Sequence, residues 1–565
     1  MPLRKLSPDV LFFLALIPLA VALYAPTLGV FFSLDDFEFL LRAAGHESWS
    51  DTWRRPISTR LFFQSAWALF GETAELYHLV GWALHLASSW MILLLARRLN
   101  LSPQGGRVAV ILFFATPVAF SSLHWISGVQ DQSMTFFALL SAWLALSRGR
   151  VTALAALLSF AVALLCKESA VLLLPAIALL LPMGKERRIT LGIGGSLIAL
   201  LILFVSGAFN PKPVGDPYET GLGINLLWNL LTYLAWSLRL WDYFPDRIPQ
   251  YQQALALWGL ISPVLLALAY WRLPWARSHI TRAAFLFLLL LLPVLPLLRH
   301  SYFYYLYLPL IPLWLLMGEG LARFASTRRW IFIVVLSLFA LGTAWAGSER
   351  RHAELGGGLL EDPMMRYAEM AENAVESARE SEKAPSGDML ILVPFLGDTQ
   401  GLGGNLRGVE GGRRVQFLPV DRALLGGKAL KLFFPKVTSA HFSYDFPPGD
   451  KWLTQEIWWT FGQGNLAPLG YGEQGRHVLA RLLFEKGEPA RAADQIRALL
   501  DLHPTDANLL YDLGRLELGA GNLGAAEDVL ASLQALASQD GAAPSLMRAL
   551  ADLKELYVAT QSREP

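Results

Sequence analysis

The stretch VLFFLALIPLAVALYAPTLGVFF at residues 10–32 is followed directly by Ser33-Leu34-Asp35-Asp36-Phe37. About 20 consecutive apolar residues are needed to cross a bilayer as a helix, so this stretch is long enough to span a membrane. The span ends at two adjacent carboxylates, Asp35 and Asp36. Ionisable residues at a membrane are costly and are functional candidates by default. The alternative is a pair of solvated loop acids that mark where the lipid ends.

Composition extends this interpretation to most of the chain. The protein has 565 residues, of which 54% are hydrophobic and 16% are charged, with a net charge of +1. Apolar stretches recur up to residue 347, and a polar region follows them. The predicted fold class is therefore an α-helical polytopic membrane protein with a C-terminal soluble region. The balanced charge argues against nucleic acid as a partner, and the single cysteine, Cys166, excludes a disulfide within the chain.

The apolar stretches predict about 11 spans, at residues 10–32, 76–96, 106–123, 132–147, 151–166, 169–183, 189–207, 254–271, 283–298, 303–322 and 330–347. Residues 224–243 are rich in Trp and Leu but contain Arg239 and Asp242. They are expected to lie in the membrane interface, where aromatic residues concentrate, or alternatively to form a twelfth span. The first span lacks a small-residue cleavage site, so we expect it to be retained.

The distribution of Lys and Arg predicts the orientation. One set of loops carries more Lys and Arg than the other, which places the N-terminus in the cytoplasm. The extracytoplasmic segments are then residues 33–75, 124–131, 167–168 and 299–302 and the chain after residue 347. The sequence has no eukaryotic sorting signal, so a bacterial inner membrane is the expected location.

Polar residues gather in these extracytoplasmic segments and in the adjoining parts of the spans, at one face of the membrane. They form five groups: Asp35-Asp36; Trp53-Arg54-Arg55-Pro56; Tyr77-His78 with His85; His124–Asp131 with Cys166-Lys167-Glu168; and Arg299-His300-Ser301-Tyr302-Phe303-Tyr304-Tyr305-Leu306-Tyr307-Leu308-Pro309. Each group also has a structural interpretation. Arg54 and Arg55 could be ordinary interface anchors, and the tyrosines an aromatic belt.

The histidines and the Lys167-Glu168 pair also have structural interpretations besides the functional ones. His78 and His85 are seven residues apart, so they share one helix face. Histidines on a helix face are more often packing residues than ligands, and their spacing does not match a zinc site. Lys167 and Glu168 could form a local ion pair that closes a tight turn.

Taken in series, several strings resemble one family. They are Leu34-Asp35-Asp36; Arg55-Pro56; Tyr77-His78-Leu79-Val80 with His85; Thr116-Pro117-Val118; Trp125-Ile126-Ser127-Gly128 with Asp131; Cys166-Lys167-Glu168; and Tyr305-Leu306-Tyr307-Leu308-Pro309. In this order they resemble the GT-C membrane glycosyltransferases, and within them the protein O-mannosyltransferases with C-terminal tetratricopeptide repeats. The sequence departs from the family at Ser121, Val129 and Tyr304, where the family has Glu, Arg and Arg. Arg299 is the candidate for a substitute cation.

The resemblance implies transfer of a sugar from a polyprenyl-phosphate donor to an acceptor hydroxyl on a protein, glycan or lipid, with inversion. A carboxylate can accept the proton of the attacking alcohol, so Asp35 is the expected base and Asp36 its positioner or alternate. The leaving lipid phosphate needs cations, for which Arg suits best. The expected phosphate ligands are Arg299, Lys167 and Arg55. The other expected substrate contacts are Asp131, Glu168, His124, His78, His85, Tyr302, Tyr305 and Tyr307.

No metal site or cofactor is predicted. Asp35 and Asp36 together could instead hold Mg²⁺ or Mn²⁺, since these cations prefer carboxylate oxygens. Two functions from other classes stay open: a transporter of a lipid-linked substrate, and a non-catalytic membrane scaffold. Transporter charges lie near the membrane midplane, whereas the charges here are expected at one face.

The membrane domain is expected to comprise residues 1–350. The chain after it is expected to form two further domains. Residues 351–470 are predicted as a small α/β segment, with strands at 389–394 and 413–420. Residues 471–565 repeat at an interval of 34 residues, as Gly487 with Gly521 and Ala492 with Ala526. That period matches tetratricopeptide-like helical repeats, which could hold an acceptor or simply cap the domain.

Overall fold

The computed structural model of the protein has two compact units. The first comprises Met1–Glu372 and Asp398–Lys428, and the second comprises Asn373–Gly397 and Ala429–Pro565. The described residues are 7–49, 54–208, 210, 216, 218–238, 256–298, 300–325, 329–356, 359–360, 362–393, 407–410, 413–416, 420–443, 446–447, 449–538 and 543–562. The division into three domains, at residues 1–350, 351–470 and 471–565, stays a prediction.

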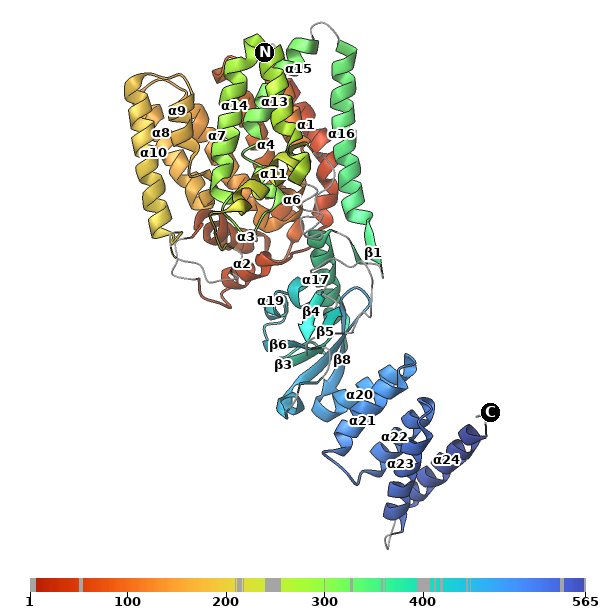
Figure 1. Cartoon of the computed structure of the whole chain (residues 1–565). Coiled ribbons are helices and arrows are strands. Elements are labelled where there is room, and N and C mark those ends of the chain that lie inside the picture. Colours follow the sequence, from red (N-terminus) through yellow and green to blue (C-terminus); the bar gives the residue numbers. More distant parts are fainter. Residues whose placement is uncertain are drawn as a thin grey trace, which may run out of the picture. The chain divides into compact units, whose positions relative to one another are not determined.

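The first unit is a bundle of helices joined by short turns (Figure 1). Its α-helices are α1 Pro8–Tyr24, α2 Asp35–Ala43, α3 Phe62–Phe70, α4 Ala74–Arg98, α5 Pro103–Phe114, α6 Pro117–His124, α7 Val129–Ala145, α8 Arg150–Cys166, α9 Leu173–Leu180, α10 Lys185–Val205, α11 Ile224–Leu238, α13 Ile261–Arg272, α14 Arg277–Leu291, α15 Ile311–Ala325, α16 Arg329–His352 and α18 Val420–Ala423.

Short turns and hairpins complete the unit. The helical turns are η1 Ala25–Gly29, η2 Ile57–Leu61, η3 Ile126–Gly128, η4 Glu168–Ala170, η5 Pro274–Ala276, η6 Leu292–Val294 and η7 Phe303–Leu306. The antiparallel strand pairs are β1 Glu354–Gly356 with β2 Leu359–Leu360 and β4 Arg407–Glu410 with β5 Arg413–Gln416.

Local sequence signals set several helix starts. Before α1, the Ser7 side chain accepts a hydrogen bond from the Val10 backbone N–H, and Pro8 occupies the first turn. Before α5, Ser102 does the same for Gly105, and Pro103 follows it. A side-chain acceptor at the cap satisfies an N–H that has no partner within the helix, and proline fits the first turn because its missing N–H is not needed there.

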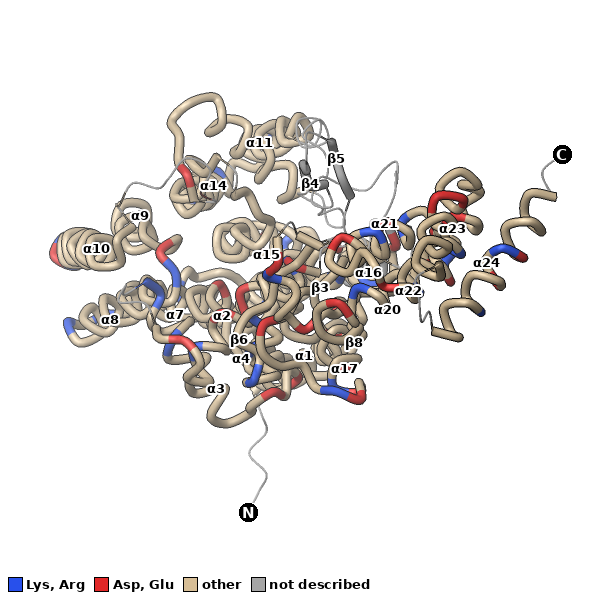
Figure 2. The backbone as a smooth tube through the Cα atoms, turned by 90° about the horizontal axis from the view of Figure 1, so that it is seen from below, with Lys and Arg blue, Asp and Glu red and all other residues tan. Residues whose placement is uncertain are grey.

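Several helices are suited to a membrane. Four described segments are long and apolar enough to cross one: Pro8–Gly29, Ala74–Arg98, Lys185–Val205 and Pro274–Val294. Helices α5 and α6, bent by 49° at their junction, make a fifth if they count as one span. Shorter apolar helices occupy Arg150–Cys166, Glu168–Leu180 and Ala256–Arg272. After their first turns, α8 and α10 carry no Lys, Arg, Asp or Glu, and their coils are tan there in Figure 2. A membrane protein is supported, and eleven spans stay a prediction.

Close helix packing within the bundle depends on small residues. A Cβ atom at Gly318 of α15 would lie 2.5 Å from the backbone oxygen of Gly105 in α5. Small residues let helices approach closely in membrane proteins, where packing drives association. α5 and α15 therefore pack backbone to backbone along this contact.

The second unit combines a sheet with paired helices. α17 Pro363–Glu380 runs from the first unit into the second. The sheet order is β6-β3-β7-β8, with β3 Gly387–Leu392 parallel to both β6 Val437–Ser443 and β7 Glu456–Phe461. β8 Asn465–Tyr471 pairs antiparallel with β7. The strands predicted near 389 and 413 are present as β3 and β5, although residues 394 and 417–419 lie outside the described chain.

The rest of this unit is helical. It contains α19 Lys428–Phe433, η9 Lys451–Thr454, α20 Gly472–Glu485, α21 Pro489–Leu500, α22 Ala507–Gly519, α23 Leu523–Ala537 and α24 Pro544–Gln561. Each of α20 to α23 packs against the next helix, and their apolar residues form one core with the sheet. Helix pairs at this spacing agree with the repeat pattern in the sequence, and assignment to the tetratricopeptide class stays a prediction.

Candidate active site

A polar cavity of about 150 Å³ lies at one end of the bundle in the first unit. Its walls come from the start of α2, the start of α7, the turn after α8 and the segment before η7. The described lining residues are Leu34, Asp35, Arg55, Trp125, Ser127, Gln130, Asp131, Lys167, Tyr218, His300, Tyr302, Tyr304 and Met364. The structure therefore brings together Asp35, Arg55, Asp131, Lys167 and Tyr302, which are far apart in the sequence.

Asp35 is the first residue of α2 and lies at this cavity. The preceding residue, Leu34, has φ +51° and ψ −125°, a conformation that non-glycine residues rarely adopt. Strained backbone of this kind concentrates at functional sites. No described residue donates a hydrogen bond to the Asp35 carboxylate. The surrounding protein displaces its hydration water and raises its pKa; Glu38 raises that pKa further, and Arg55 opposes the shift.

Asp36 has a different environment from its neighbour. Its side chain is fully buried. One carboxylate oxygen accepts hydrogen bonds from the backbone N–H of Ser127, at 2.8 Å, and from the Ser127 hydroxyl. The other accepts the backbone N–H of Ser33 at 3.0 Å. Burial raises the pKa of Asp36 to about 7, although the Ser127 and Ser33 hydrogen bonds lower it. The Asp36 carboxylate thus joins the start of α2 to η3 through its hydrogen bonds with Ser127.

Arg55 is fixed by two neighbouring elements. It has φ +55° and is followed by η2, a π-helical turn, which is a feature often found at functional sites. Its Nε and Nη2 each lie 2.7 Å from a carboxylate oxygen of Glu168, and Nη1 donates to Gln130 Oε1 at 2.9 Å. Arg54 Nη2 contacts the same carboxylate at 3.3 Å. Two guanidinium groups therefore share one carboxylate.

Lys167 pairs with Asp131 and not with its neighbour Glu168. Lys167 Nζ lies 2.8 Å and 2.7 Å from the two Asp131 oxygens. Its backbone is extended, with φ −162° and ψ 132°, and successive side chains of an extended chain point to opposite sides. The alternative of a local Lys167–Glu168 ion pair is therefore wrong. The Lys167 ammonium also lies 4.7 Å and 4.8 Å from the ring centres of Tyr304 and Tyr305.

A second cavity, of about 470 Å³, adjoins the first. The two cavities share Arg55, Lys167 and Tyr218. The second also reaches Leu203, Ser206 and Gly207 at the end of α10, as well as Tyr305 and Leu297.

Charge distinguishes the two cavities. Among the described lining residues of the second, Arg54, Arg55 and Lys167 face one carboxylate, Glu168, which gives a net charge of +2. In the first, Arg55 and Lys167 are balanced by Asp35 and Asp131. The larger cavity therefore favours an anion, whereas the smaller one combines neutrality with an accessible carboxylate.

Four predicted contacts lie outside both linings. The ring nitrogens of His78 contact the backbone oxygens of Leu123 and Val30, each at 2.9 Å. His85 contacts the Tyr307 hydroxyl and the Phe114 backbone oxygen. His124 stacks on Phe120 and contacts its backbone oxygen at 3.0 Å. These histidines and Tyr307 are buried and join backbone segments, so they are not carried into the proposal below.

Arg299 lies outside the described residues, so the structure does not test it as a phosphate ligand. His300 and Tyr302, which follow it, line the smaller cavity. His300 and Gln130 belong to the polar groups named from the sequence but were not among the expected substrate contacts, and Tyr218 was not named at all. Burial, with a further contribution from Lys167, Arg55 and Arg54, lowers the pKa of His300 to about 3. Burial and the cationic neighbours together keep this imidazole neutral.

Comparison with protein families agrees with the position of the site. Residues 54–208 match the model of the dolichyl-phosphate-mannose-protein mannosyltransferase family. This segment runs from Arg54 to Ala208, both of which line the larger cavity, and it contains Asp131, Lys167 and Glu168. No curated protein matches the chain. The match supports a membrane glycosyltransferase of the GT-C type and a mannosyltransferase-like activity in general.

The structure also bears on a position at which the sequence departs from the family and on the possible metal site. Tyr304, where the family has Arg, lines the smaller cavity and faces Lys167. Among the residues that the structure describes, no three His, Cys, Asp or Glu side chains are grouped as metal ligands. Both Asp36 oxygens are already occupied by hydrogen-bond donors, so Asp36 fits poorly as a partner of Asp35 in holding Mg²⁺ or Mn²⁺.

Proposed function

We propose that the protein transfers a sugar from a polyprenyl-phosphate donor to an acceptor hydroxyl, with inversion, at the extracytoplasmic face of the membrane. The observation that carries the proposal is the pair of adjoining cavities. One is cationic and reaches the end of a membrane helix, and the other presents Asp35, to which no described residue donates a hydrogen bond. The extracytoplasmic side rests on the Lys and Arg distribution in the loops.

The larger cavity suits the donor phosphate. It reaches Leu203 in α10 and Gly207 just beyond the end of that helix. The apolar side chains of Leu200, Leu201 and Phe204 on α10 are exposed. A polyprenyl tail can therefore stay in the bilayer along α10 while its phosphate reaches the three cations. The excess of two positive charges complements the phosphate that leaves when the sugar is transferred.

Arg55 and Lys167 must change partners, in part, for this to occur. In the present structure each is paired with a carboxylate. A guanidinium can bind two oxygens at once and has five N–H donors, so Arg55 can keep one contact with Glu168 and still meet a phosphate oxygen. Arg54, whose contact with Glu168 is longer at 3.3 Å, needs the smallest rearrangement.

The smaller cavity suits the acceptor. The acceptor hydroxyl attacks the anomeric carbon, its proton passes to the Asp35 carboxylate, and the bond to the phosphate oxygen breaks, leaving the phosphate beside the cations. A positioned base contributes about 10²–10⁴-fold to the rate. Because the attacking and leaving oxygens lie on opposite sides of the sugar, a single displacement inverts the anomeric centre. The acceptor is a hydroxyl on a protein, a glycan or a lipid.

The test is transfer by the purified full-length protein from a panel of polyprenyl-phosphate hexoses. We expect product from at least one donor, and loss of about 10²–10⁴-fold in rate for Asp35→Asn. The matched control is Glu75→Gln, which removes an exposed carboxylate from the same predicted segment, 33–75, and no described ion pair. No transfer from any donor, or equal rates for Asp35→Asn and the control, would overturn the proposal and favour the scaffold or the transporter.

A further inference from the structure

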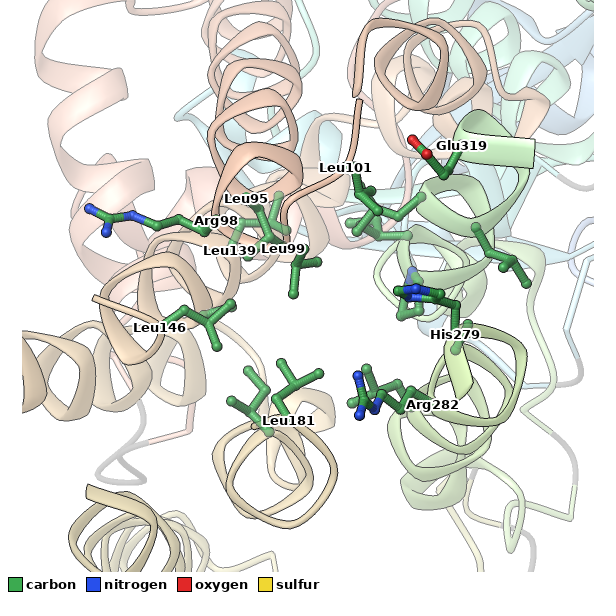
Figure 3. A pocket seen from close by; sticks show the side chains of 18 of the residues that line it. Leu95, Arg98, Leu99, Leu101, Leu139, Leu146, Leu181, His279, Arg282 and Glu319 are labelled. Atoms are coloured by element: carbon green, nitrogen blue, oxygen red, sulfur yellow. The ribbon is translucent and has the colours of Figure 1, made fainter. Parts of the chain in front are cut away.

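A third cavity, of about 280 Å³, lies toward the other end of the same bundle. Figure 3 shows it from close by. α7 begins beside Asp131 at the polar cavity and ends beside Leu146 at this one. At about 1.5 Å per helical residue, the α7 lining of the third cavity starts at Ala138, about 10 Å from Asp131, and ends at Leu146, about 22 Å from it. The third cavity shares no described lining residue with either polar cavity.

The walls of this cavity are mainly apolar, and the polar residues among them are Arg98, Asn100, His279, Arg282 and Glu319. They come from α4, α7, α9, α14 and α15, and Leu95, Leu139 and Leu181 face the space in Figure 3. Its volume is close to the lower end of the range for small-molecule sites, about 300–1,000 Å³. A space of this size suits part of one hydrocarbon chain better than a bulky ring system.

Charge at the cavity is unbalanced. Arg282 and His279, from the first turns of α14, point into the cavity in Figure 3. No described carboxylate pairs with Arg282. Glu319 also lines the cavity, but its oxygens accept hydrogen bonds from the Ser102 N–H and hydroxyl, each at 2.8 Å, and from Arg323 Nε at 2.8 Å. Its charge is thus already compensated.

We propose that this cavity binds a membrane phospholipid with an anionic headgroup, with one acyl chain among the leucines and the phosphate beside Arg282. Apolar walls exclude a free anion as the main occupant, and the uncompensated Arg282 favours an anionic over a zwitterionic lipid. Basic pockets between helices at the cytoplasmic side are a recognised way of binding anionic lipid headgroups. The loops at this end are those predicted to be cytoplasmic, where anionic lipids concentrate.

The experiment is lipid titration of the full-length protein in detergent, followed by native mass spectrometry. The probes are phosphatidylglycerol, phosphatidylcholine with the same acyl chains, and glycerol phosphate without chains. We expect phosphatidylglycerol to bind in preference to the other two. One Arg near the membrane surface is worth about fivefold in affinity, so Arg282→Gln should weaken phosphatidylglycerol binding by about that factor.

Two further variants sharpen the test. Ala142→Phe places a ring in the cavity and should remove binding of phosphatidylglycerol. Arg272→Gln removes an exposed arginine from the end of α13 that does not line the cavity, and should have no effect. Equal binding of the two phospholipids, binding of glycerol phosphate alone, an equal effect of Arg272→Gln and Arg282→Gln, or preferential retention of a polyprenyl phosphate would overturn the proposal.

Discussion

The contrast between Asp35 and Asp36 yields the sharpest prediction. The two residues are adjacent and chemically identical, but Asp36 is fully buried with three hydrogen-bond donors, whereas Asp35 has none among the described residues. We expect substitution of Asp36 to lower stability and substitution of Asp35 to lower activity while stability is retained.

The structure sets the magnitude. Asp36→Ala leaves the backbone N–H groups of Ser33 and Ser127 without acceptors. Each buried group left without a partner costs about 1–3 kcal/mol, so the free energy of unfolding should fall by about 2–6 kcal/mol. Asp35→Asn removes no described hydrogen bond, and substitutions of this kind usually change stability by about 0.5 kcal/mol or less.

The pH dependence of stability gives an independent check on Asp36. Its folded pKa, about 7, lies above the value of about 3.9 expected for an unfolded Asp. The contribution of Asp36 is therefore fully present below pH 4 and is lost as pH rises through 7. Its slope is at most about 1.4 kcal/mol per pH unit. Asp36→Ala should remove this part of the pH dependence and should be most destabilising at acid pH.

The assay is unfolding of each purified variant in detergent at pH 5 and pH 8, followed by a transfer assay at a temperature where all variants are folded. The reasoning is refuted if Asp36→Ala unfolds like the unmodified protein at pH 5. It is also refuted if Asp35→Asn loses as much stability as Asp36→Ala.

Three other predictions follow from the same site. Lys167→Met should lower the free energy of unfolding by about 3–5 kcal/mol because it leaves Asp131 buried and charged, and adding Asp131→Leu should restore most of it in a double-mutant cycle. Glu38→Gln should lower the pKa of Asp35, so the rate of transfer should persist to lower pH than in the unmodified protein; an unchanged acid limb contradicts this. Treatment with EDTA should leave the transfer rate unchanged, since both Asp36 oxygens are occupied by hydrogen-bond donors, and a loss restored by Mg²⁺ or Mn²⁺ would contradict it.

The sequence predicted which residues would lie at the same cavity. It did not predict which of their charged side chains would form ion pairs. Asp35, Arg55, Asp131 and Lys167 share one cavity, as expected from their positions at the ends of apolar stretches. Hydropathy fixes the end of the bundle at which a residue lies. It contains no information on the extended backbone at Lys167 that separates this side chain from Glu168.

The histidines show a second limit of pattern-based prediction. Spacing places His78 and His85 on one helix face, and the structure agrees. That face is buried in the bundle, where the ring nitrogens meet backbone oxygens such as those of Val30 and Phe114. Those oxygens come from chain segments remote in sequence, so no local pattern identifies them. His300 was named in a polar group but not as a substrate contact, because its burial and its cationic neighbours arise only on folding.

Three described residues, Arg55, Lys167 and Tyr218, line both polar cavities. Every other described lining residue belongs to one of the two cavities alone, so single substitutions can reshape one cavity and leave the other cavity and the membrane helices in place. Preference for one lipid-linked sugar and preference for one recipient can therefore diverge separately during evolution, while the scaffold that carries both stays the same.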